Sequence, residues 1–74
     1  MEIEVRLFAG LRQYAKPHDK IELEDGKRVS DLFERLGIPP PKVAIILVDG
    51  RHAQQDQPLQ DGETVSLFPA IAGG

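Results

Sequence analysis

One stretch of this chain has the periodicity of a helix, and that stretch constrains the fold more than any other feature. Four apolar residues repeat at the spacing of a single helix face: Val29, Leu32, Phe33 and Leu36. They predict a helix over residues 29–37. A chain of 74 residues has room for one small domain. Because no second helix is available to cover this apolar face, we expect the helix to pack on a β-sheet.

The ends of this helix are marked by charge and by glycine. Asp31 lies near the start, where the helix dipole favours an acid. Gly37 is placed to end the helix as a left-handed cap. The start is open between two choices, because Ser30 would be a good N-cap but would leave Val29 outside the helix. The prolines at residues 39–41 prevent continuation and predict a stiff, extended linker.

The remaining apolar residues follow the patterns of strands. Alternation over residues 2–8, 21–24 and 64–68 predicts half-buried strands, and a short return strand is expected at residues 51–53 after the Asp49-Gly50 turn. Six consecutive apolar residues at 43–48 predict a central strand. The order β-β-α-β-β-β predicts an α+β fold of the β-grasp type. Its mixed sheet has four to five strands and one main helix, and the first and last long strands are parallel at its centre.

Alternation also divides the side chains between the two faces of the sheet. We expect the helix to pack on one inward-facing set: Ile3, Val5, Leu23, Ile45 and Val65. Phe8 and Phe68 have the opposite parity, so both should face away from the helix. Two outward aromatic side chains on neighbouring strands are typical of an exposed apolar patch that binds a partner.

Charge and composition exclude several classes of protein. Nine Lys plus Arg against twelve Asp plus Glu give a net charge of −3, which argues against nucleic-acid binding. The absence of cysteine excludes a disulfide framework, thiolate metal ligands and a cysteine nucleophile. No apolar run approaches the roughly 18 residues of a membrane span, and the acidic start is unlike a signal peptide. We expect a cytoplasmic protein with no membrane or nucleic-acid partner.

Groups for catalysis are missing from the sequence. His18 and His52 lie far apart and have no partners at the spacing of metal ligands or of a catalytic pair. Ser30 and Ser66 have no base nearby in the sequence, which leaves nucleophilic catalysis without support. We therefore predict no metal site and no catalytic residue, and we favour a binding or carrier module over an enzyme.

The chain ends in Gly73-Gly74. Glycines at an end do not help packing, but an enzyme that activates a terminal carboxylate must admit the chain into a narrow channel, where residues without a Cβ allow close approach. Pro69 cannot continue a strand ladder through its nitrogen, so it directs the chain away from the sheet. We expect a β-grasp domain over residues 1–69 and a flexible tail over residues 70–74.

The β-grasp pattern and the terminal glycines together resemble ubiquitin-like sulfur carriers of the MoaD/ThiS family, and most closely its MoaD-type members, the small subunits of molybdopterin synthase. The resemblance covers essentially the whole chain. Three pieces carry it: Val5-Arg6-Leu7-Phe8-Ala9-Gly10-Leu11-Arg12, Val48-Asp49-Gly50, and Asp61 through Pro69 running into Gly73-Gly74. The block that ends in the two glycines is the most specific of the three.

The resemblance implies a function without catalysis by this chain. A ubiquitin-activating-type adenylyltransferase (MoeB/ThiF-like) would use ATP to adenylate Gly74, and sulfur would then replace AMP to give a thiocarboxylate. A MoaE-like large subunit of molybdopterin synthase would take the sulfur for a molybdenum or tungsten pterin cofactor. No cofactor would be stably bound by the chain itself.

The resemblance also assigns roles to individual residues. Ile71, Ala72 and Gly73 would be recognised as part of the tail. Phe8 and Phe68 would bind partners together with His52, which stands where the family often has an aliphatic residue.

Two alternatives remain open at this point. One is a ThiS-like sulfur carrier for the thiamine thiazole or another sulfur-containing product. The other is a ubiquitin-like modifier that forms isopeptide bonds with lysines. All three functions share the tail, so the tail residues do not separate them.

Overall fold

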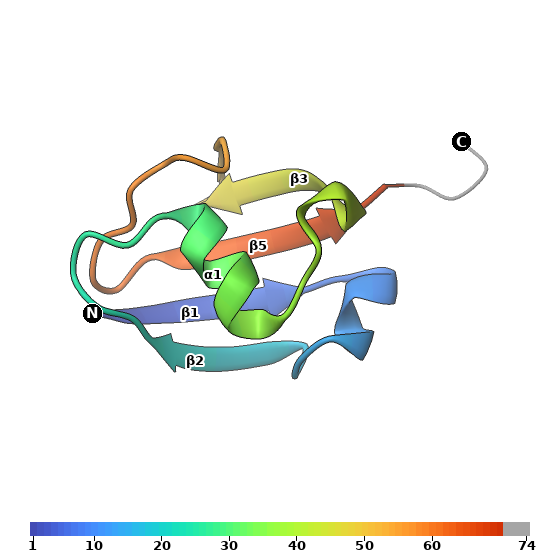
Figure 1. The fold of residues 1–74 in the computed structure, drawn as a ribbon, viewed down its shortest axis with the longest axis horizontal. Helices are drawn as coiled ribbons and strands as arrows, with labels where there is room; N and C mark the ends of the chain where they lie inside the picture. The colour runs from blue at the N-terminus through green and yellow to red at the C-terminus, as the bar shows by residue number, and fades with distance from the viewer. Residues whose placement is uncertain (71–74) are drawn as a thin grey trace.

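The computed structural model describes residues 1–70, and the predictions made for residues 71–74 fall outside this part. It contains a five-stranded sheet, one α-helix and two short 3-10 helices (Figure 1). In chain order the elements are β1 (Glu2–Leu7), η1 (Ala9–Gln13), β2 (His18–Glu22), α1 (Val29–Leu36), η2 (Pro40–Lys42), β3 (Val43–Val48), β4 (Arg51–His52) and β5 (Thr64–Pro69). No helix in residues 1–70 has the length and apolar character needed to cross a membrane.

The sheet has the order β2-β1-β5-β3-β4. At its centre β1 and β5 run parallel, with Val5 beside Val65 and Leu7 beside Leu67. The hairpin partners lie outside them, because β2 pairs antiparallel with β1 and β3 pairs antiparallel with β5. The short β4 pairs with the outer side of β3. The predicted β-grasp arrangement, with its mixed sheet and single main helix, is confirmed.

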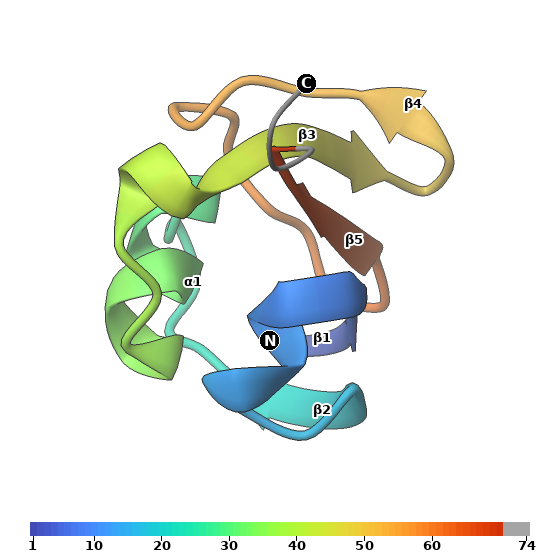
Figure 2. The ribbon, with the colours of Figure 1, turned by 90° about the vertical axis from the view of Figure 1, so that its right-hand side faces the viewer.

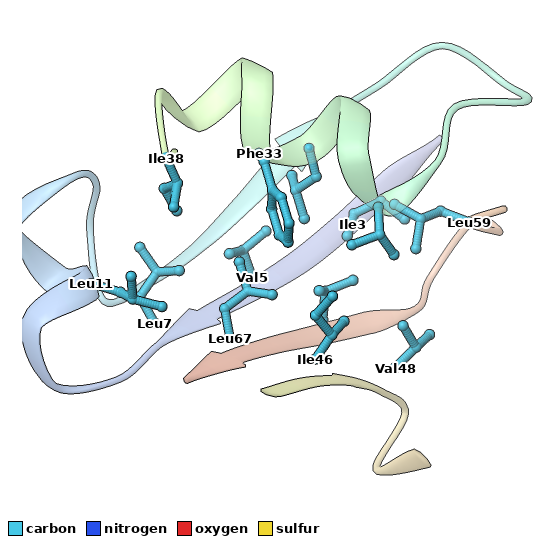
Figure 3. Close-up of a cluster of buried hydrophobic side chains, with 13 residues drawn as sticks. Ile3, Val5, Leu7, Leu11, Phe33, Ile38, Ile46, Val48, Leu59 and Leu67 are labelled. Carbon is cyan, nitrogen blue, oxygen red and sulfur yellow. The ribbon is translucent and has the colours of Figure 1, made fainter. Parts of the chain in front are cut away.

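The core lies between α1 and the inward face of the sheet (Figures 2 and 3). On the helix Val29, Leu32 and Phe33 are buried, whereas Leu36 is half-buried. The strands and loops contribute the other buried side chains: Ile3, Val5, Leu7, Leu11, Ile38, Ile46, Val48, Leu59, Val65 and Leu67. A helix of eight residues would not be stable alone in water, so this packing maintains it.

The structure shows where α1 begins, which the sequence left open because Ser30 was a possible N-cap. Arg28 is the N-cap, so both Val29 and Ser30 are helical, and the Asp31 carboxylate accepts a hydrogen bond of 2.8 Å from the Arg28 backbone N–H. Gly37 ends the helix with φ of +73°, a conformation that other residues adopt at a cost. Beyond it, the prediction of an extended proline linker is wrong, because residues 40–42 form η2.

Two strand predictions need correction. The second strand spans His18–Glu22 rather than residues 21–24, because the backbone ladder with β1 extends through polar residues that show no apolar alternation. The strand at 43–48 is not buried throughout: Ile45, predicted to contact the helix, is 41% exposed. Between Val43 and Ile45 the pairing with β5 shifts by one residue, which is a β-bulge at Ala44. This bulge reverses the face on which Ile45 lies.

Candidate functional site

Phe8 and Phe68 meet on the outward face of the sheet, the face opposite α1. Their rings stack with centroids 4.3 Å apart and planes inclined by 10°. Both side chains are half-buried, while the neighbouring Leu7 and Leu67 are buried in the core. The predicted orientation of both aromatics is therefore confirmed. Their pairing follows from the parallel alignment of β1 and β5, which brings the ends of the two strands together.

An apolar groove surrounds the two rings. Ile45 lies across from Phe68 in the β3–β5 ladder and forms one wall. The groove has a volume of about 580 Å³, and its lining is Phe8, Ala9, Gly10, Ile45, Phe68, Pro69 and Ala70. We call this feature the Phe8–Phe68 groove. Because Ala70 is part of the lining, the chain leaves β5 directly beside the groove.

Local backbone geometry explains why the groove lies at this end of the sheet. The Phe8 N–H donates to the Leu67 carbonyl over 3.2 Å, which fixes Phe8 beside the end of β5. Ala9 then adopts a φ of +51°, which turns the chain into η1. On the other side Pro69 pairs with Val43 at the start of β3. The groove is thus framed by segments that begin or end at one edge of the fold (Figure 2).

His52 lies on β4 and does not line the groove. It pairs with Leu47 in the β3–β4 ladder and is exposed. Leu47 in turn pairs with Ser66, two residues before Phe68. The structure therefore places His52 on the sheet beside the strands of the groove, while it brings Phe8 and Phe68 into contact with each other. The role of His52 in partner binding stays a prediction.

The other end of the outward face is polar. Glu4 lies at its centre, with one carboxylate oxygen 3.3 Å from His18 Nε2 and the other 3.5 Å from Arg6. The Thr64 hydroxyl donates to the same carboxylate over 3.3 Å. The hydrogen bond with His18 lowers the pKa of the Glu4 carboxyl most, the charges and hydroxyl around it lower it further, and partial desolvation opposes the change. This cluster joins β1, β2 and β5.

The Phe8–Phe68 groove is lined by apolar side chains and glycine. Its lining contains no titratable side chain, so it holds no general acid or base. Across residues 1–70 no three His, Asp or Glu side chains form a group that could hold a metal ion. Sequence reasoning missed Ile45 as a wall of the groove, because a run of six apolar residues gives no alternation from which to locate a bulge. Gly74, Gly73, Ala72 and Ile71 lie outside the described residues.

A β-grasp sheet with an outward apolar groove at the point where the chain leaves its last strand defines a ubiquitin-like protein. The comparison with family models is more specific, since the ThiS family model matches residues 5–74. The chain belongs to the ThiS family, whose members include small ubiquitin-like sulfur carriers and related modifiers. No curated protein sequence matches the chain significantly.

Solved structures agree with this assignment. A protein named as molybdopterin converting factor subunit 1 from Pyrococcus furiosus is 30% identical, with a TM-score of 0.77 over 95% of this chain and 98% of that one. In the complex of molybdopterin-converting factor subunits 1 and 2 from Helicobacter pylori, the similar chain is 25% identical, with a TM-score of 0.64 and full coverage of both chains. Small archaeal modifier protein 1 from Haloferax volcanii shares the fold at 20% identity, with a TM-score of 0.78 over 95% of this chain and 98% of that one.

Proposed function

We propose that this protein is a sulfur carrier whose Gly74 becomes a thiocarboxylate and donates sulfur in the biosynthesis of molybdopterin. The observation that carries the proposal is the family match, which runs from residue 5 to residue 74 and so includes Gly73-Gly74. The likeness to two molybdopterin converting factor subunits, at 30% and 25% identity, supports molybdopterin as the product.

The chemistry requires activation, because a carboxylate is a poor electrophile. A ubiquitin-activating-type adenylyltransferase, MoeB/ThiF-like, joins the Gly74 carboxylate to the AMP part of ATP and releases pyrophosphate. A sulfur nucleophile then attacks the acyl carbon and displaces AMP, which leaves the thiocarboxylate. In this scheme ATP is used by the activating enzyme, and the chain itself supplies an accessible end, not a catalytic group.

The Phe8–Phe68 groove serves as the docking surface for the enzymes that act on the tail. Interfaces are enriched in aromatic residues at their apolar centre, and the stacked Phe8 and Phe68 rings provide such a centre. Because Ala70 lines the groove, a protein that covers the groove also receives the residues after Ala70. The Helicobacter pylori complex of subunits 1 and 2 favours a MoaE-like large subunit as one such partner.

Two other functions are compatible with this family, and the experiment described below distinguishes them. A ThiS-like carrier would deliver the sulfur to the thiamine thiazole or another product. A ubiquitin-like modifier would form isopeptide bonds, and the small archaeal modifier protein supports this outcome only through its shared fold.

The test is intact-mass analysis of the chain after incubation with an activating enzyme from the same organism, ATP and sulfide. The proposal predicts a mass increase equal to the difference between a sulfur and an oxygen atom, located on Gly74. The thiocarboxylate form should then convert a pterin precursor to molybdopterin when the large subunit is added. Adducts on lysines instead would support the modifier function. A thiocarboxylate that is used only by a thiazole synthase would support the ThiS-like function.

A further inference from the structure

At the end of the molecule where β5 finishes, the described segments carry cationic side chains and no acidic residue. Three segments meet there: residues 8–17, residues 37–45 and residues 68–70 (Figure 2). Their charged residues are Arg12, Lys16 and Lys42, and all three are exposed. All twelve acidic residues of the sequence lie elsewhere. We call Arg12, Lys16 and Lys42 the cationic rim.

The opposite end of the molecule has the reverse charge. It holds the N-terminus, the loop after β2, the β3–β4 turn and the loop before β5 (Figure 1). The acidic residues of these segments and of the adjoining strand ends outnumber the cations Lys27, Arg28 and Arg51: Glu2, Glu22, Glu24, Asp25, Asp49, Asp56, Asp61 and Glu63. A protein with a net charge of −3 therefore presents a positive end. Such a separation of charge orients a molecule as it approaches a charged partner.

The cationic rim has no carboxylate partner within the described part of the chain. The ion pairs of residues 1–70 involve the N-terminal ammonium with Glu22 and Asp25, and Glu4 with its neighbours. Arg12 is exposed and donates from Nε to the Leu7 carbonyl at the end of β1 over 3.5 Å. The three positive charges are therefore available to another molecule.

The rim adjoins the place where the chain leaves the fold. Ala70 lines both the Phe8–Phe68 groove and a second hollow, whose walls include Tyr14 and Lys42. An apolar groove next to exposed cations has the composition of an interface, with an apolar centre and a charged margin. A nucleic acid is a poor match for this end, because the groove is apolar and the protein as a whole is acidic.

We propose that the cationic rim is complementary to an acidic protein surface, one whose carboxylates surround the opening that receives the residues after Ala70. This inference rests on the proposed function, and it adds that the surface of the partner around the opening is acidic. Rim charges act mainly on the rate of association, so the rim should steer the tail toward that opening. The partner chosen for the test is the activating enzyme.

The experiment measures association of the wild-type chain with a ubiquitin-activating-type adenylyltransferase from the same organism, between about 50 and 500 mM salt. Variant Lys16→Gln/Lys42→Gln removes two rim charges without touching the groove. The matched control, Lys20→Gln/Lys27→Gln, removes two charges away from the rim. We expect the association rate of the rim variant to fall about tenfold at low salt and to lose most of its salt dependence. The control should stay within about twofold of the wild type.

Each outcome decides the inference. Binding that is measurable but independent of salt, or an equal loss in both variants, would overturn the acidic partner and leave the sulfur-carrier function standing. No binding of the wild-type chain at any salt concentration would overturn both. Tight, salt-sensitive binding of a single-stranded oligonucleotide, with none to the enzyme, would show that the rim serves a nucleic acid instead.

Discussion

Ile45 and Ile46 are consecutive in β3 and lie on opposite faces of the sheet. Ile46 is 7% exposed and belongs to the core, whereas Ile45 is 41% exposed and forms a wall of the Phe8–Phe68 groove. Ile46→Ala should lower the free energy of unfolding by about 2–4 kcal/mol, because it leaves a cavity beside α1. Ile45→Ala should lower it by less than about 1 kcal/mol.

Denaturant unfolding of the two variants checks this difference. The pair is well matched, because the residue type, the strand and the substitution are the same. Equal losses of stability would mean that the bulge at Ala44 does not set the faces of β3 in solution.

Phe68 should contribute to partner binding far more than to folding. Phe68→Ala removes one of two stacked rings from the groove, so we expect a MoaE-like large subunit to bind more weakly by at least about 1 kcal/mol. The loss of the stacking contact should lower the stability of the free protein by only about 0.5–1.5 kcal/mol. Calorimetric titration and thermal unfolding measure the two effects separately.

Ser66→Ala is the control for this variant. Ser66 precedes Phe68 by two residues on the same face of β5 and does not line the groove. It should leave binding nearly unchanged. If Phe68→Ala binds as the wild type does but unfolds much more easily, then the ring is a structural element and the groove is not the docking surface.

The sequence predicted the central strands well for a physical reason. Apolar and polar residues alternate along β1 and over Thr64–Leu67 of β5, so the parity that buries Val5 and Val65 also turns Phe8 and Phe68 outward. In β3 parity fails. Val43 packs toward the core, and counting by two from Val43 places Ile45 there as well. The bulge at Ala44 adds one residue and reverses Ile45, and no pattern in six apolar residues reveals it.

The cationic rim could not be predicted from the order of residues along the chain. Arg12, Lys16 and Lys42 are separated in sequence, and each looks like an ordinary surface cation. Only the packing of η1 and η2 around the end of β5 brings their segments to one end of the molecule. The resemblance predicts that His52 binds partners together with Phe8 and Phe68. His52 lies on β4, with β3 between β4 and β5, and its role in partner binding stays a prediction.

Stability should depend on pH through Glu4. The pKa of this carboxyl is lowered in the folded protein, chiefly by the hydrogen bond with His18. A lowered pKa means that the charged form stabilises the fold above the pKa of the unfolded chain, and that this contribution is lost as the pH falls through the folded value. Thermal unfolding should therefore move to lower temperature between about pH 5 and pH 3, partly because of Glu4.

Glu4→Gln should reduce that dependence on acid, since an amide does not titrate. The control is Glu24→Gln, an exposed residue that makes no ion pair with the rest of residues 1–70. Identical pH profiles for wild type and Glu4→Gln would show that the contacts of Glu4 with His18, Arg6 and Thr64 do not stabilise the fold in solution.

The terminal glycines should be required for sulfur loading and irrelevant to folding. Deleting Gly74 should abolish the mass increase produced with the activating enzyme, ATP and sulfide, because the reacting carboxylate is then carried by another residue. Gly73→Leu should block the same reaction, since a side chain at that position must pass the narrow channel that admits the chain end.

Neither change touches a residue of the core within residues 1–70, so thermal unfolding should match the wild type. Ser66→Ala, which keeps the tail length and the glycines and does not change the groove lining, should load normally. Full loading of the Gly74 deletion would contradict the sulfur-carrier function, and a Gly74-dependent transfer to lysines would assign the tail to protein modification.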